Sequence, residues 1–82
     1  MKNVIYLNRW AHIYHLILVR TDGEVDYRLH SRICLSLPEA RQLLEQWQEK
    51  HHVAPEHIQD NSSLDLNELM KGIETDFLPA QN

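Results

Sequence analysis

Residues 25–37, VDYRLHSRICLSL, alternate between apolar and polar side chains. The apolar ones fall at odd positions: Val25, Tyr27, Leu29, Ile33, Leu35 and Leu37. The polar ones beside them fall at even positions: Glu24, Asp26, Arg28, His30 and Ser36. A period of two over this length is typical of extended chain with one face in solvent and one face buried. We therefore predict a β-strand over residues 24–36 whose odd-numbered face lies against the core.

Two further strands are expected upstream, over residues 3–7 and 12–20. The second of them is apolar on both faces, which is typical of a central strand. Thr21-Asp22-Gly23, between residues 20 and 24, is a hairpin signal. A three-residue loop pairs Val19 with Val25, whereas a two-residue loop pairs Leu18 with Tyr27. We favour the first register because it places apolar side chains on the odd-numbered face of both strands.

The spacing of apolar residues becomes helical from residue 37 onward. Ser36 and Glu39 have the spacing of a capping box, which predicts that a helix over residues 37–50 begins here. Its apolar stripe comprises Leu37, Ala40, Leu43, Leu44 and Trp47. A short helical turn is expected at residues 55–58, and a loop at residues 59–63. A second helix is expected over residues 64–77, with Ser63 or Asp65 as its cap, followed by a frayed tail at residues 78–82.

These elements predict one α+β domain over residues 1–82. Its expected architecture is a three-stranded antiparallel meander with two C-terminal helices packed on one face, the odd-numbered one. The other face of the sheet is then open to solvent.

Composition limits what a chain of 82 residues can do. One modest core is available at this length, and Cys34 has no second cysteine with which to form a disulfide. A lone cysteine and the absence of a signal-like leader favour a reducing cytoplasm. The net charge of −4 is unevenly spread: residues 1–32 carry five basic and three acidic side chains, and residues 33–82 carry three basic and nine acidic ones.

Catalytic and metal-binding patterns do not stand out. Six histidines are present, but His12 and His15 point to opposite faces of a strand, and no set of three or four converging zinc ligands follows from their spacing. Gly23 and Gly72 are the only glycines, so no glycine-rich phosphate or oxyanion loop is available. Cys34 is expected to be structural rather than nucleophilic. We therefore predict a protein that is not an enzyme and has no cofactor and no metal.

Protein binding fits the pattern best, because the expected open face has an apolar centre and a charged rim. The predicted partner-binding residues are Tyr6, Trp10, Tyr14, Leu16, Leu18, Arg20 and Arg28. The occupant is either another protein or a second copy of the chain in a homodimer. A third alternative is a single-stranded nucleic-acid binder that uses Arg9, Trp10, Arg28 and Arg32, although the acidic net charge repels phosphate. No segment is apolar enough to suggest a membrane partner.

The N-terminal quarter of the chain resembles a family of small phage-encoded anti-CRISPR proteins of the type I-F inhibitor class. The resemblance lies in the start Met1-Lys2 and in the spacing of Tyr6-Leu7, Tyr14, Ile17, Val19 and Gly23. It implies a strand meander followed by two short helices. It also implies an inhibitor that docks on a CRISPR surveillance complex and blocks target DNA without catalysis. Tyr6 matches a contact tyrosine of that family, whereas Arg20 and Ser31 stand at or near two of its other contact positions.

Overall fold

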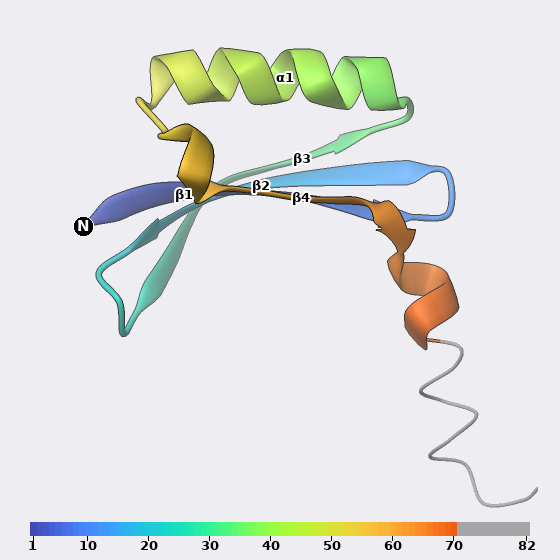
Figure 1. Ribbon diagram of the computed structural model, residues 1–82, viewed down its shortest axis with the longest axis horizontal. Helices are drawn as coiled ribbons and strands as arrows, with labels where there is room; N and C mark the ends of the chain where they lie inside the picture. Colours follow the sequence, from blue (N-terminus) through green and yellow to red (C-terminus); the bar gives the residue numbers. More distant parts are fainter. Residues whose placement is uncertain (71–82) are drawn as a thin grey trace, which may run out of the picture.

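The computed structural model describes residues 1–70 and has a single sheet with a helix across one face (Figure 1). Three strands form the predicted antiparallel meander: β1 (Lys2–Trp10), β2 (Ile13–Thr21) and β3 (Asp26–Cys34). The α+β class is therefore confirmed. β1 is longer than the predicted 3–7, because the chain reverses in a two-residue turn between Trp10 and Ile13.

A fourth strand, β4 (Ile58–Asp65), lies beside β1 and runs parallel to it, so the strand order is β3-β2-β1-β4. The predicted loop at residues 59–63 is therefore wrong. The segment is polar and reads as a loop, but it supplies backbone partners to the free edge of β1, and backbone groups pair regardless of side-chain type. The predicted helical turn before it is present as a short 3₁₀ helix, η1 (Pro55–His57).

Helix α1 (Leu37–Lys50) begins where the capping box predicted. The Ser36 side chain accepts a hydrogen bond from the backbone N–H of Glu39, and the Glu39 carboxylate accepts one from the N–H of Leu35. Ala40 and Trp47 are buried against the sheet. The remaining members of the predicted stripe are partly buried against the same core: Leu37, Leu43 and Leu44.

The C-terminus of α1 closes with a left-handed residue that is not glycine. His52 has φ 52°, and the N–H of Val53 bonds to the carbonyl of Gln48, as in a Schellman motif. The side chain of Val53 is buried in the core. The helix end is therefore sealed by an apolar contact as well as by backbone hydrogen bonds.

The helix covers the face of the sheet opposite to the predicted one. Leu16 and Leu18 of β2 are fully buried beneath α1 together with Ile5 and Leu7 of β1. The prediction that both helices pack on the odd-numbered face is wrong for α1, because the core uses even positions of β2. Since β2 is apolar on both faces, its own sequence does not indicate which face a helix will cover.

The β2–β3 loop is one reason why the observed register of β3 differs from the predicted one. Strand pairing begins at Thr21 and Asp26, so the loop has four residues, 22–25. The Asp22 carboxylate accepts hydrogen bonds from the backbone N–H groups of Glu24 and Val25, at 2.9 and 2.8 Å. Gly23 has φ 101°, a conformation that glycine adopts without strain. Val25, expected in the strand, is therefore part of the loop.

A β-bulge in β3 changes the register a second time. Leu18 pairs with His30, but the next residue, Val19, pairs with Arg28, so Leu29 is the extra residue. Beyond the bulge, odd positions of β2 pair with odd positions of β3, as in the pairing of Ile17 with Ser31. Neither register considered from the sequence is the observed one.

A second helix begins after β4 and is helical over residues 66–70. Asp65 accepts a hydrogen bond from the N–H of Asn67 and so caps it, as predicted. In Figure 1 this helix lies below the sheet, on the side away from α1. The rest of the predicted helix (residues 71–77) and the predicted tail (residues 78–82) lie outside the described residues. No helix within residues 1–70 is long and apolar enough to cross a membrane.

Candidate functional site

The second face of the sheet is also apolar. Residues that pair directly across strands share a face, so the pairs Val4–Val19, Tyr6–Ile17 and His15–Ile33 place these side chains together, opposite α1. We call this surface the open face. Its apolar and aromatic members are Val4, Tyr6, Trp10, Ile13, Ile17, Val19 and Ile33.

Within residues 1–70, α1 lies on the other side of the sheet, and the short helix at residues 66–70 lies below one end of the sheet (Figure 1). Ile33 is 62% exposed, Ile13 41% and Trp10 39%. Val4 and Val19 are buried, yet they do not belong to the cluster beneath α1. Their neighbours in the sheet shield them. The open face therefore has a shielded centre and apolar side chains exposed toward its margins.

The polar groups of the open face are largely satisfied within the sheet. The His15 ring and the Ser31 hydroxyl share a hydrogen bond of 2.5 Å. The Asn61 amide of β4 donates to the Asn8 side-chain oxygen of β1 at 3.0 Å. Polar side chains that already form hydrogen bonds with each other pay a smaller desolvation cost when they are buried. Burial of this face against another surface is therefore favoured.

The structure separates the predicted partner-binding residues into two groups. Tyr6, Trp10 and Arg28 lie on the open face. The other four lie on the side that α1 covers, so their placement on an open face is wrong, although Arg20 itself is exposed: Tyr14, Leu16, Leu18 and Arg20. Tyr14, Leu16 and Leu18 belong to the core under α1 or pack against it, and Arg20 pairs with Asn3 on the same side.

Sequence reasoning missed Ile17, Ile33 and Ile13 as members of the exposed surface. The signal was present, because they lie on the odd-numbered face, which the alternation of β3 correctly marked as apolar. That face was assigned to the core, and the other apolar face of β2 to solvent. An apolar alternation shows that two faces differ, but it does not show which of two apolar faces a helix covers.

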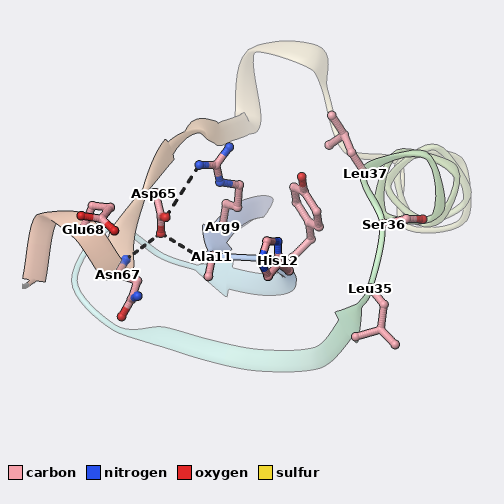
Figure 2. Close-up of a pocket in the computed structure, with 10 residues that line it drawn as sticks. Arg9, Ala11, His12, Leu35, Ser36, Leu37, Asp65, Asn67 and Glu68 are labelled. Carbon is pink, nitrogen blue, oxygen red and sulfur yellow. Dashed lines mark hydrogen bonds and ion pairs between the residues drawn. The ribbon is translucent and has the colours of Figure 1, made fainter.

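A hollow of about 590 Å³ lies at the end of the sheet where the β1–β2 turn, the β3–α1 connection and the end of β4 meet (Figure 2). The Asp65 carboxylate accepts a hydrogen bond from the N–H of Ala11 at 2.9 Å and forms an ion pair with Arg9 at 3.8 Å. The hydrogen bond from Ala11, with further backbone hydrogen bonds and the charge of Arg9, holds the pKa of Asp65 below its ordinary value. Asp65 therefore connects β1, through Arg9, with the β1–β2 turn, through Ala11, and with the helix that follows β4, through Asn67.

Cys34 has the environment of a structural cysteine. Its side chain is 2% exposed and belongs to the core. Burial, reinforced by the charge of Glu39, raises the pKa of the thiol. A raised pKa keeps the group protonated and weakly nucleophilic. Within residues 1–70 no three histidine, cysteine or acidic side chains lie close enough together to hold a metal ion.

The residues predicted for nucleic-acid binding are not brought together. Trp10 and Arg28 lie on the open face, whereas Arg9 is paired with Asp65. Arg32 lies on the α1 side, opposite Leu16. The aromatic and basic side chains therefore do not form one stacking platform.

Comparison with known proteins gives no family for this chain. No protein-family model matches it, and neither a curated protein nor a solved structure shows significant similarity to it. Function must therefore be inferred from the surface itself.

Proposed function

We propose that this chain is a non-enzymatic protein-binding module and that the open face is its interface. The observation that carries the proposal is a sheet with two apolar faces, of which α1 covers one. Soluble proteins that act alone seldom leave a contiguous apolar patch of this kind in water. Trp10 and Tyr6, aromatic side chains of the kind that dominate binding energy at interfaces, lie on this face.

The size of the open face suits a protein partner. Strands of eight or nine residues at about 3.3 Å per residue, four of them about 4.8 Å apart, span roughly 600 Å². A standard interface buries about 800 Å² of accessible surface on each partner. The accessible surface of the open face exceeds its flat area, because side chains project from the sheet. A flat, apolar surface of this extent matches another protein surface better than a small ligand, which requires a concave site.

The resemblance to type I-F anti-CRISPR proteins gives the proposal a narrower form. Tyr6, the position that matches a contact tyrosine of that family, lies on the open face. In this form the partner is a CRISPR surveillance complex, and the chain acts in the cytoplasm by occluding the binding of target DNA. Target-DNA binding by a purified type I-F complex, measured with the wild-type chain and with Tyr6→Ala, tests it.

A homodimer is the second candidate occupant. Asp26 and Arg28 lie two residues apart in β3 and give the margin of the open face both signs of charge. A second copy related by a two-fold axis is therefore not repelled, and the same face serves both subunits.

Site-specific photo-cross-linking tests the interface. Benzoylphenylalanine replaces Tyr6 at the centre of the open face or, as the matched control, Leu35, which is 75% exposed and lies outside the sheet. We expect a cross-linked product from position 6 and not from position 35, and we expect the additional change Ile17→Asp to abolish it. Sedimentation then distinguishes a second copy from a foreign partner, because the monomer has a mass of 9.7 kDa.

Two results would contradict the proposal: equal cross-linking from positions 6 and 35, or a product that survives Ile17→Asp in a chain with a wild-type circular dichroism spectrum.

A further inference from the structure

Positive charge gathers around His51, at the C-terminal end of α1. Two hollows meet at this residue, one of about 540 Å³ and one of about 310 Å³. The basic and histidine side chains that line them are Lys2, Arg20, His30, Arg32, Lys50, His51, His52 and His57. We call this set the cationic end.

No carboxylate from the described residues lines either hollow. Within residues 1–70 the ion pairs are Arg9–Asp65 and Arg41–Asp60, so none involves a member of the cationic end. Acidic groups do lie on the flanks: Asp22 shares a neighbouring hollow with Lys2, and Glu39 shares one with Arg32. Glu49 and Glu56 are the sequence neighbours of Lys50 and His57 but do not line the two hollows. In a chain of net charge −4, this is a local excess of positive charge.

The carbonyl groups at the end of the helix carry partial negative charge, and three of them already have hydrogen-bond partners within the chain. The carbonyls of Trp47 and Gln48 accept the N–H groups of His51 and Val53. The carbonyl of His51 accepts a hydrogen bond from the Asn3 amide at 3.1 Å. The Asn3 side-chain oxygen in turn accepts from Arg20 Nε at 3.3 Å, which fixes the guanidinium beside His51. The terminal nitrogens of Arg20 keep donors for a ligand.

The pKa of the His51 imidazole is affected by the positive side chains around it. Its ring lies 5.4 Å from the ring of His30. Burial, followed by the charges of His30, Lys50, Arg20 and His52, lowers the pKa of His51. Every charge that acts on the ring is positive, so an anion placed here would relieve the repulsion and stabilise the imidazolium.

We propose that the cationic end binds a small, multiply charged phosphate anion and binds it more tightly as the histidines protonate. Arg20 and Lys50 supply permanent charge, and an arginine suits bidentate contact with phosphate oxygens. His51 adds charge as the pH falls, since imidazole side chains titrate near neutral pH. Two adjoining hollows offer room for more than one phosphate group. Lys2 lies at the margin of the open face, whereas Arg20, His30 and Arg32 lie on the α1 side of the sheet, so the site does not depend on the proposed interface.

Trimetaphosphate is a suitable probe, because its charge is constant between about pH 6 and about pH 8, where histidines titrate. Binding to the full chain is followed by amide chemical shifts at low salt. We expect the shifts to centre on residues 20 and 50–53, and the affinity to rise roughly tenfold from pH 8 to pH 6, a typical coupling between two sites. Reciprocally, the probe should raise the pKa of His51, observed on its ring protons.

Matched variants test the location. Arg20→Gln should weaken binding at both pH values by roughly fivefold or more, whereas Arg28→Gln, an equal change in net charge on the open face, should not. His51→Gln should reduce the pH dependence, and His12→Gln, in the distant β1–β2 turn, should leave it unchanged. Equal effects of Arg20→Gln and Arg28→Gln would overturn the proposal, since only non-specific attraction would remain. Binding of a single-stranded oligonucleotide without binding of trimetaphosphate would also overturn it.

Discussion

Asp65 accepts a hydrogen bond from the backbone N–H of Ala11, 54 residues earlier in the chain, at 2.9 Å. Ala11 has φ 55°, in the left-handed region that residues other than glycine rarely adopt. Ala11, the residue with the unfavourable backbone conformation in the β1–β2 turn, is thus held by a hydrogen bond to a carboxylate at the end of β4. The same carboxylate caps the following helix through Asn67.

This relationship predicts that stability depends on the charge of Asp65. Because the folded-state pKa is lowered, the stabilisation is fully present above the ordinary value of 3.8 and is lost as the pH falls through the lower folded value. We expect Asp65→Asn to lower the melting temperature at neutral pH. The difference from wild type should shrink as the pH falls below about 4, where the carboxyl of the unfolded chain takes up a proton, and should be smallest below the lowered folded-state pKa, where the folded carboxyl is neutral as well. Thermal melts across this range check it, and a difference independent of pH would contradict it.

Two neighbouring residues of β2 should differ in how much their substitution destabilises the protein. Leu16 is fully buried under α1, so Leu16→Ala should lower the free energy of unfolding by about 2–5 kcal/mol. Ile17 points to the open face, and Ile17→Ala should cost about 1 kcal/mol or less. Urea unfolding of both variants measures the difference. Similar losses at the two positions would show that both faces of β2 are covered.

Replacing His52 with glycine should stabilise the protein. A left-handed residue at this helix end costs roughly 1 kcal/mol unless it is glycine. For a domain of this size a gain of 1 kcal/mol raises the melting temperature by roughly 4–8 °C. His51, with φ −106°, is the matched control, because His51→Gly relieves no strain and should destabilise the helix. A melting temperature for His52→Gly at or below the wild-type value would contradict the expectation.

The thiol of Cys34 should react slowly in the folded protein. Its burial and its raised pKa both suppress the thiolate that attacks disulfide reagents. We expect the rate with a chromogenic disulfide to lie far below that of free cysteine at the same pH and to recover fully in denaturant. Rapid reaction of the native chain would require Cys34 to be accessible.

Sequence patterns within a single segment correctly predicted α1 and β3. Ser36 and Glu39 located the start of α1, because a capping interaction involves residues only three positions apart. Apolar alternation predicted β3, and the helical stripe of α1 correctly included Ala40 and Trp47. Each of these features is complete within one segment of the sequence.

The errors arose where a distant segment decides the structure. β4 is polar, and it forms a strand because β1 has a free edge. The register of β3 against β2 depends on the four-residue loop held by Asp22 and on the bulge at Leu29, and neither has a unique sequence signature. Three of the predicted interface residues, Tyr6, Trp10 and Arg28, lie on the open face. The prediction that the face with Tyr14, Leu16 and Leu18 is open is wrong, because α1 covers that face.

The bulge at Leu29 also affects how molecules of this protein meet edge to edge. β3 is a border strand with apolar side chains at Tyr27, Leu29 and Ile33, the kind of strand that recruits identical strands into fibres. Endless stacking needs an unbroken row of backbone donors and acceptors, and the extra residue interrupts that row in the middle of the strand. We therefore expect the bulge at Leu29 to disfavour edge-to-edge polymerisation through β3.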